Sequence, residues 1–154
     1  LFTMNLKSLF FIATLFFSAS CMVAQHKNGV AVVEFSTLSM RGYAEKIRIT
    51  SDSVWITMEE RREASSSKTH GRKLTSQEWS QLMKATETVS IAEVPALKSP
   101  TMARAFDGAM HSSITLQTIH GTGVSHSFDN ENPHEKLQLL MKTIREIVQN
   151  TPER

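Results

Sequence analysis

The sequence predicts an α+β fold, in which an antiparallel sheet of four or five strands carries two amphipathic helices packed on one face. Alternating apolar residues on both sides of a glycine-containing turn predict a hairpin at 111–128. Two segments follow helix-start signals and repeat apolar residues at helical spacing, one after Thr75 and one after Asn132. Hairpins followed by helices are typical of an antiparallel sheet covered on one side.

The N-terminus carries the features of a secretory signal peptide. Lys7 precedes an apolar run at 9–17, which is too short for a comfortable membrane span and is followed by small residues. We expect cleavage after Ala24, so that residues 1–24 form the signal peptide and 25–154 form a single α+β domain without a membrane span. The protein would then be exported, either periplasmic or secreted. A lipoprotein anchored through Cys21 is the disfavoured alternative, because Ser18 occupies a position where a lipobox has a leucine-like residue.

Composition and charge argue against two classes of partner. The chain is 40% hydrophobic and 21% charged, as is ordinary for a globular domain, and 17 Lys and Arg face 15 Asp and Glu. This near-balance argues against nucleic acid or an anionic membrane as the partner. Cys21 is the only cysteine and would leave with the signal peptide, so neither a disulfide nor a thiol nucleophile is expected in the exported domain. We expect a monomer or a weak oligomer.

The first strands follow the proposed cleavage site. Residues 30–35 are β-branched and aromatic, and segments 43–49 and 54–58 flank a turn at Ser51-Asp52. A two-residue loop there pairs Ile49 with Val54 and places the apolar residues on one face. Arg48 then lies opposite Trp55, either as a cation–π pair or as an exposed edge contact.

The middle of the chain contains two predicted loops and one helix. Residues 61–73 are polar, basic and serine-rich, which favours a solvated connector over a loop that embraces an acidic partner. Thr75 and Glu78 form a capping box, and the helix that follows should bury Trp79. Residues 91–97 are expected to be irregular because of the nearby prolines, and 99–108 is expected to be a second long loop.

The C-terminal hairpin has a register that the apolar pattern can test. A three-residue loop at 121–123 places Thr118 opposite His126 and Leu116 opposite Phe128, with apolar side chains on one face. A two-residue loop would split the apolar set between the two faces. The opposite, solvent-facing side would carry a polar set: Ser113, Thr115, Gln117, Ser125 and Ser127.

The last helix is predicted to begin at Asn132, with Pro133 at its first position and Glu135 completing a capping box. A stripe at helical spacing should cover the hairpin. It consists of Leu137, Leu140, Met141, Ile144, Ile147 and Val148.

Candidate catalytic groups are few. His111, His120 and His126 lie on or beside the C-terminal hairpin, but zinc generally needs more ligands at recognised spacings. The adjacent Glu59 and Glu60 would point to opposite faces of a strand, and no nucleophile elbow occurs. We therefore expect no catalytic, cofactor-binding or metal-binding residues. A small hydrolase or metal-dependent enzyme that uses these histidines is the alternative.

Three short motifs carry a resemblance. These are Arg41-Gly42-Tyr43 entering a strand, the 96–101 segment with Arg104 and Asp107 before the next strand, and Phe128-Asp129-Asn130 before the last helix. In these motifs and in the order of its elements the chain resembles small exported α+β proteins of Bacteroidota, and more distantly it is similar to emfourin-type inhibitors of metalloproteases. The inhibitor family has a Gly-Gly-Phe-x-Gly run where this chain has only Gly42 and Tyr43.

The leading functional expectation is an exported, non-catalytic binding domain that contacts its partner through loops on a rigid scaffold. The partner would be an exported protease, which would make the domain an inhibitor, or an envelope protein. Tyr43, Arg104 and Asp107 are the expected binding residues. A structural envelope component is a further alternative.

Export is directly testable. If residues 9–17 are the apolar core of a signal peptide, the mature chain should begin at or near Gln25. N-terminal mass analysis of the protein recovered from the exported fraction measures this. A lipid on Cys21 would instead show an anchored protein, and an intact N-terminus would contradict export.

Overall fold

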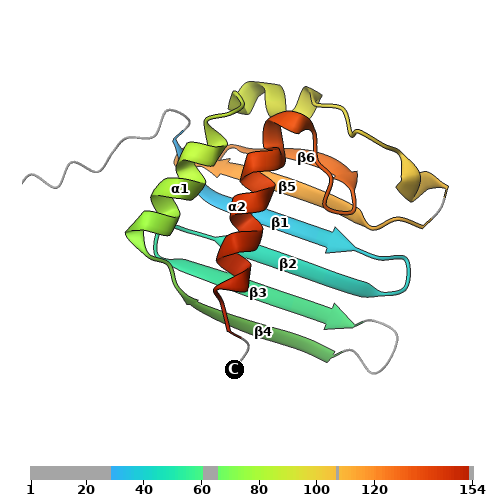
Figure 1. The fold of residues 1–154 in the computed structure, drawn as a ribbon, viewed down its shortest axis with the longest axis horizontal. Coiled ribbons are helices and arrows are strands. Elements are labelled where there is room, and N and C mark those ends of the chain that lie inside the picture. The colour runs from blue at the N-terminus through green and yellow to red at the C-terminus, as the bar shows by residue number, and fades with distance from the viewer. Residues whose placement is uncertain (1–28, 61–65, 107, 153–154) are drawn as a thin grey trace, which may run out of the picture.

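The computed structural model describes residues 29–60, 66–106 and 108–152, and it shows an α+β fold built on a six-stranded antiparallel sheet (Figure 1). The strand order is β4-β3-β2-β1-β5-β6. The strands are β1 (Val30–Leu38), β2 (Tyr43–Ile49), β3 (Ser53–Glu60), β4 (Ser66–Lys73), β5 (His111–Thr118) and β6 (Gly123–Asp129). The helices α1 (Ser76–Thr86) and α2 (Gln138–Gln149) pack together and cross the same face of the sheet (Figure 1).

The central strand β1 explains why the core forms where it does. Its apolar residues Val33 and Phe35 are completely buried and stand beside Ile47 and Ile49 of β2 and beside apolar residues of β5. This row faces the helices. The sheet face away from the helices is polar, and cross-strand hydroxyl pairs follow it, such as Ser36 with Ser113 at 2.9 Å.

The β2–β3 hairpin has the predicted register. Ile49 pairs with Val54 across the short turn, and Arg48 stands opposite Trp55. The guanidinium of Arg48 forms an ion pair with Glu34 of β1, which makes it part of a charge pair on the polar face. Trp55 remains half exposed.

Strand β4 corrects two predictions, the strand count and the loop at 61–73. Residues 66–73 pair with β3 along their whole length, while 61–65 lie outside the described residues. The segment lacks apolar residues because it is an edge strand with exposed side chains, and its ladder depends on backbone hydrogen bonds. Gly71 is required here: a Cβ would lie 2.7 Å from the Trp55 ring and 2.4 Å from the Val54 carbonyl oxygen.

The β5–β6 register also differs from the prediction. Leu116 pairs with Val124 and Ile114 with His126, and the three-residue loop comprises 119–121. Gly121 has φ +80°, so it supplies the left-handed residue at the end of that loop. The predicted loop placed Gly121 first, which shifted the loop by two residues. Because the shift is even, His126 and Phe128 still face the core.

The two helices begin differently. The capping box of α1 is present as predicted: Thr75 accepts a hydrogen bond from the Glu78 N–H, and Glu78 accepts one from the Thr75 N–H. Trp79 is only partly buried, at the edge of the core. The capping box predicted at Asn132 is wrong, because His134 caps a short 3-10 turn, η3 (Glu135–Leu137), and the α-helix starts at Gln138.

Two further short helices precede β5. Residues 91–97 are not irregular as expected, because η1 (Ile91–Ala96) is a 3-10 helix that contains Pro95 and buries Val94 beside β6. The described residues of the predicted loop at 99–108, which are 99–106 and 108, are largely irregular as predicted, with one 3-10 turn at η2 (Ala103–Ala105).

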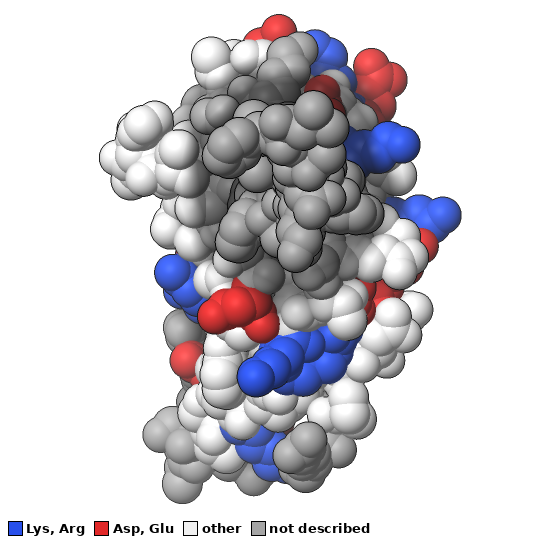
Figure 2. Space-filling view, turned by 90° about the vertical axis from the view of Figure 1, so that its left-hand side faces the viewer, with Lys and Arg blue, Asp and Glu red and all other residues white. Residues whose placement is uncertain are grey.

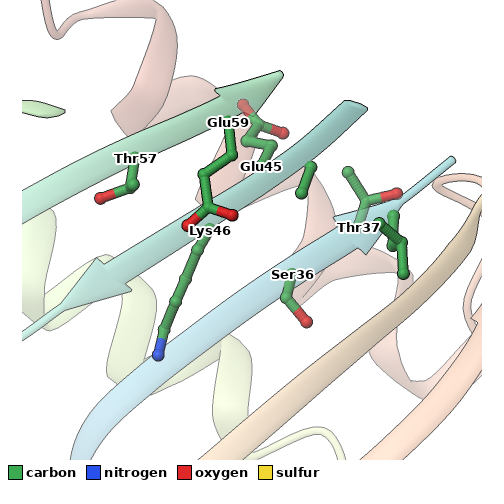
Figure 3. A pocket seen from close by; sticks show the side chains of 8 residues that line it. Ser36, Thr37, Glu45, Lys46, Thr57 and Glu59 are labelled. Carbon is green, nitrogen blue, oxygen red and sulfur yellow. The ribbon is translucent and has the colours of Figure 1, made fainter. Parts of the chain in front are cut away.

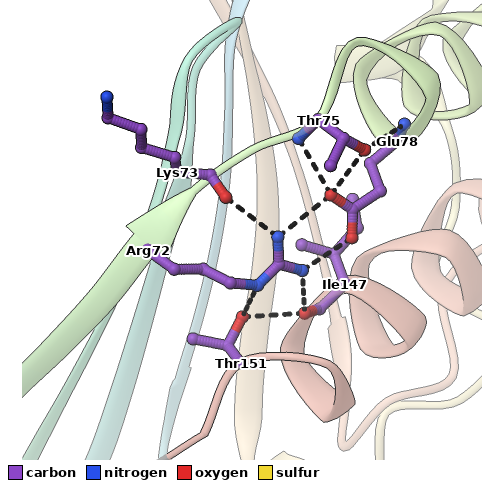
Figure 4. Close-up of polar contacts among 6 residues, drawn as sticks. All are labelled: Arg72, Lys73, Thr75, Glu78, Ile147 and Thr151. Carbon is purple, nitrogen blue, oxygen red and sulfur yellow. Dashed lines mark hydrogen bonds and ion pairs between the residues drawn. The ribbon is translucent and has the colours of Figure 1, made fainter.

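Arg72 ties the edge strand to both helices (Figure 4). Its guanidinium donates to both carboxylate oxygens of Glu78, at 3.0 and 2.6 Å, and to the Lys73 carbonyl oxygen at 3.0 Å. It also donates to the Ile147 carbonyl oxygen at 3.2 Å and to Thr151 Oγ1 at 3.0 Å. One side chain therefore joins β4 to the start of α1 and to the end of α2.

A second arginine anchors α2 to β2. Arg145 donates two hydrogen bonds to the mostly buried Glu45, at 3.2 and 2.9 Å, and also pairs with Glu131. Its guanidinium carbon lies 4.8 Å from the centre of the Phe35 ring.

Among the described residues, no helix is long and apolar enough to cross a membrane.

The apolar stripe of α2 gives a stability prediction. Leu140 is completely buried, so Leu140→Ala should lower the free energy of unfolding by about 2–5 kcal/mol. Lys142→Ala is the matched control, since the Lys142 side chain is 73% exposed and should contribute little. Urea denaturation measures both. Equal losses would contradict this orientation of the helix.

The Arg72–Glu78 pair gives a pH prediction. Hydrogen bonding from Arg72, supported by Thr75, lowers the Glu78 pKa from 4.5 to about 2. A carboxyl with a lowered pKa in the folded state stabilises the fold above its unfolded pKa, and this contribution is lost as pH falls from about 4.5 towards 2. Glu78→Gln should therefore cost about 1.5–3 kcal/mol at pH 7, and the difference from the wild type should shrink as pH falls. Glu146→Gln, at an exposed position, should cost little throughout; a Glu78→Gln deficit that stayed constant down to pH 2 would rule out the ion pair as its source.

Candidate functional site

A buried carboxylate organises the loop before β5. Asp129 at the end of β6 is 1% exposed, and it accepts hydrogen bonds from Thr101 Oγ1 and, at 2.6 Å, from the Ala103 N–H. Arg104 forms an ion pair with its other oxygen. Three residues of the loop, Thr101, Ala103 and Arg104, are thus attached to the end of β6, and residues 101–104 are held as a defined surface element.

The electrostatics of Asp129 agree with this role. Burial alone would raise the pKa of the carboxyl, but the hydrogen bonds from Thr101, Arg104 and Ala103 and the charge of Arg104 outweigh it and lower the pKa to about 2. The carboxylate is therefore ionised at all ordinary pH values. Its charge is matched by Arg104, so the pair is an internal brace.

The fixed loop presents apolar side chains to solvent. Met102 is 54% exposed and Phe106 is 89% exposed. The β1–β2 hairpin presents Leu38, Met40 and Tyr43, and it lies at the same end of the sheet, because Leu38 pairs with the first residue of β5 (right-hand side of Figure 1). Large apolar side chains gathered on neighbouring loops typically mark an interaction surface.

The predicted binding residues have different outcomes. Tyr43 is partly exposed on this surface, and burial together with Glu45 raises its pKa. Arg104 lies beside the surface, but its guanidinium is paired with Asp129 and therefore braces the loop. Asp107 lies outside the described residues. Sequence reasoning overlooked Phe106 and Met102, although large apolar residues in a loop otherwise made of small and polar ones were a visible signal.

A groove runs beside this loop. It encloses about 470 Å³ between the 95–104 segment and β6, and its lining includes Leu97, Met102, Arg104, Ser125 and His126. The groove is open to solvent at Ser125 and Ser127, which are exposed. Its walls are preformed, since both are attached to the core.

His126 serves as a structural link between these walls. It is 2% exposed, stacks on Phe128 with ring centres 5.5 Å apart, and its Nε2 accepts a hydrogen bond from the His134 N–H at 3.3 Å. Burial, together with His134 and Arg104, lowers its pKa, while a hydrogen bond with the backbone of Leu97 acts in the opposite direction. The ring is therefore neutral near pH 7 and joins β6 to both flanking segments.

The three histidines of the alternative enzyme hypothesis do not form a cluster. His111 and His120 are exposed at opposite ends of β5, and His126 is buried opposite Ile114. Among the described residues, no group of three or more histidine, cysteine or acidic side chains is placed to hold a metal ion.

A second hollow lies at the ends of β1, β2 and β3 (Figure 3). It measures about 240 Å³, and Ser36, Lys46, Thr57 and Glu59 are among the residues that line it. Another lining residue, Glu45, is already paired with Arg145. This hollow, which Leu38 and Ala44 also line, is smaller than the groove beside β6, so we place the candidate site at the groove and the adjoining loops.

The end of the molecule away from the candidate site carries charges of both signs. Figure 2 views the end of the molecule opposite the exposed loop residues, and there blue and red side chains alternate without forming a patch of one sign in the described part. The formal net charge of +2 agrees with this mixture.

Comparison of the chain with protein-family models and with curated proteins finds no match.

The role of Asp129 as a brace is testable. Asp129→Asn removes the charge that holds Arg104, so hydrogen exchange in residues 99–106 should accelerate while the helices and β1 remain protected. Asp52→Asn changes a carboxylate in the turn at the other end of the sheet and should leave residues 99–106 unaffected. Unchanged exchange in the loop of the Asp129→Asn variant would show that the ion pair does not fix it.

Proposed function

We propose that this protein is a non-catalytic protein-binding domain whose contact surface comprises the braced loop at 101–106 and the tip of the β1–β2 hairpin. The observation that carries the proposal is the exposure of Phe106, at 89%, beside a loop fixed by the buried Asp129. Exposure of a large apolar side chain to water is unfavourable. When such a side chain is held on a rigid element, its burial at an interface is favourable, because little conformational entropy is lost on binding.

The apolar residues of this surface have the composition of interface anchors. Phenylalanine, tyrosine and methionine are enriched in protein interfaces, and here they are Phe106, Tyr43, Met40 and Met102. The remaining loop residues are small or polar and suit a rim around them. Arg104 contributes indirectly, through its ion pair with Asp129.

The setting proposed for this binding is outside the cytoplasm. It depends on residues 1–24, which carry the signal-peptide features and lie outside the described residues. An exported protease or an envelope protein would be the partner. The inhibitor form of the proposal rests on the sequence resemblance and requires the purified domain to abolish metalloprotease activity at near-equal molar amounts.

The surface can be tested by matched substitutions. A partner is first captured from the exported fraction with the tagged wild-type protein and identified by mass spectrometry. The paired change Met102→Ser and Phe106→Ser should then weaken its binding by about 2 kcal/mol or more, roughly 30-fold, because both side chains are expected to be buried on binding. Isothermal titration calorimetry gives the dissociation constants, and circular dichroism checks folding.

Ile119→Ser is the control, since Ile119 is 63% exposed in the loop at the opposite end of the sheet. It should leave the affinity unchanged. If Ile119→Ser abolished binding and the Met102 and Phe106 changes did not, the contact surface would lie at the other end of the molecule.

A further inference from the structure

In the described part of the chain, no further strand pairs with the outer edge of β6, and η1 packs beside it. β6 is the last strand of the sheet on that side, and the 97–104 segment runs along its outer side (Figure 1). An unpaired edge carries a row of backbone donors and acceptors that can pair with another strand. Whether the groove can use this row depends on which residues direct their backbone groups outward.

The ladder of β5 and β6 answers that question. The Thr118 N–H donates to the Thr122 carbonyl oxygen at 2.9 Å, and the Asn130 N–H donates to the Met110 carbonyl oxygen at 2.8 Å. In an antiparallel pair, hydrogen-bonded residues alternate with residues whose backbone groups point away. Even-numbered residues of β6 therefore bond to β5, and Ser125 and Ser127 direct their N–H and C=O groups into the groove.

The groove supplies more than a bare edge. At its far end Asp129 is already used, because its carbonyl oxygen accepts from the Asn132 N–H at 3.1 Å. Leu97 and Met102 give the facing wall an apolar character. The charged lining residues are Lys98 and Arg104, and Asp129 neutralises Arg104, so Lys98 leaves the groove with one positive charge.

The other free edge of the sheet lacks these features. β4 carries Lys68 and Lys73 along an exposed strand, and charged edge residues of this kind discourage pairing with another strand. In the described part of the chain, only the edge at β6 combines outward backbone groups with a facing wall.

We propose that the groove binds an extended, acidic segment of a partner protein, which adds to the sheet as a strand beside β6 and pairs with the backbone of Ser125 and Ser127. An acidic side chain of that segment lies at Lys98, and apolar side chains of alternate residues lie against Leu97 and Met102. This mode of binding rests on the proposed function and specifies how one segment of the partner is held.

The test uses a defined probe and the isotope-labelled exported protein. The probe is a peptide of about eight residues that alternates threonine and valine around a central glutamate, which is long enough to span the outward pairs. On titration, nuclear magnetic resonance should show shifts and slowed hydrogen exchange at the amides of Ser125 and Ser127. The same peptide N-methylated at alternate residues, so that it cannot pair, should not bind.

Substitutions then separate backbone pairing from side-chain contact. Ser127→Pro removes an outward N–H without breaking the β5 ladder and should weaken probe binding by about tenfold or more. Ser127→Ala keeps that N–H and should preserve binding. Thr69→Pro, at an outward position of β4, is the control for proline in an edge strand and should also preserve binding.

Replacing the central glutamate of the probe by lysine should weaken binding to the wild type, and Lys98→Ala should remove that difference.

Two results would overturn the proposal. One is a probe that shifts residues elsewhere but leaves Ser125 and Ser127 unchanged. The other is protection of these amides by raised protein concentration alone, which would identify a second copy of the chain as the occupant. If the peptide fails while capture of the natural partner still depends on Phe106, strand addition is wrong and the proposed function stands.

Discussion

The guanidinium of Arg72 is the interaction on which the arrangement of sheet and helices most depends. A partly buried cation is tolerable only when its donors are satisfied, and here five hydrogen bonds, to Lys73, Glu78, Ile147 and Thr151, occupy them. Strand β4 has no large apolar side chain to hold it in place. Arg72 supplies that attachment through the Glu78 side chain of α1 and through the Ile147 carbonyl oxygen in the last turn of α2, where carbonyl groups lack partners within the helix.

A similar principle fixes the other side of α2. Arg145 joins the helix to Glu45 of β2 and to Glu131 before η3 while it lies over the ring of Phe35. The apolar stripe of α2 stabilises its packing without selecting one orientation, since apolar contact is not directional. The two arginines add that direction, because a bidentate pair is satisfied in only one geometry.

Sequence reasoning succeeded where the determining contacts are local. The β2–β3 register follows from a short turn and its apolar pairs, and the start of α1 follows from Thr75 and Glu78. It failed where the deciding contact is distant or subtle. β4 forms because β3 offers it an edge, and the β5–β6 loop is displaced because Gly121 takes the last loop position. The α2 start moved because His134, rather than Asn132, caps the preceding turn.

The candidate site shows the same division. An unpaired arginine in a loop is indistinguishable by sequence from a binding residue, and only the fold places Asp129, 25 positions away, against Arg104. That ion pair changes how the loop could function. Because Arg104 is paired within the scaffold, the proposed interface would depend on Phe106 and Met102, which are exposed and lie outside the core. The same brace holds one wall of the groove opposite the free backbone of β6, so a partner would meet apolar anchors and a strand edge fixed by a single buried carboxylate. Little of the free energy of binding would then be lost to ordering the loop, which is the advantage of preorganisation.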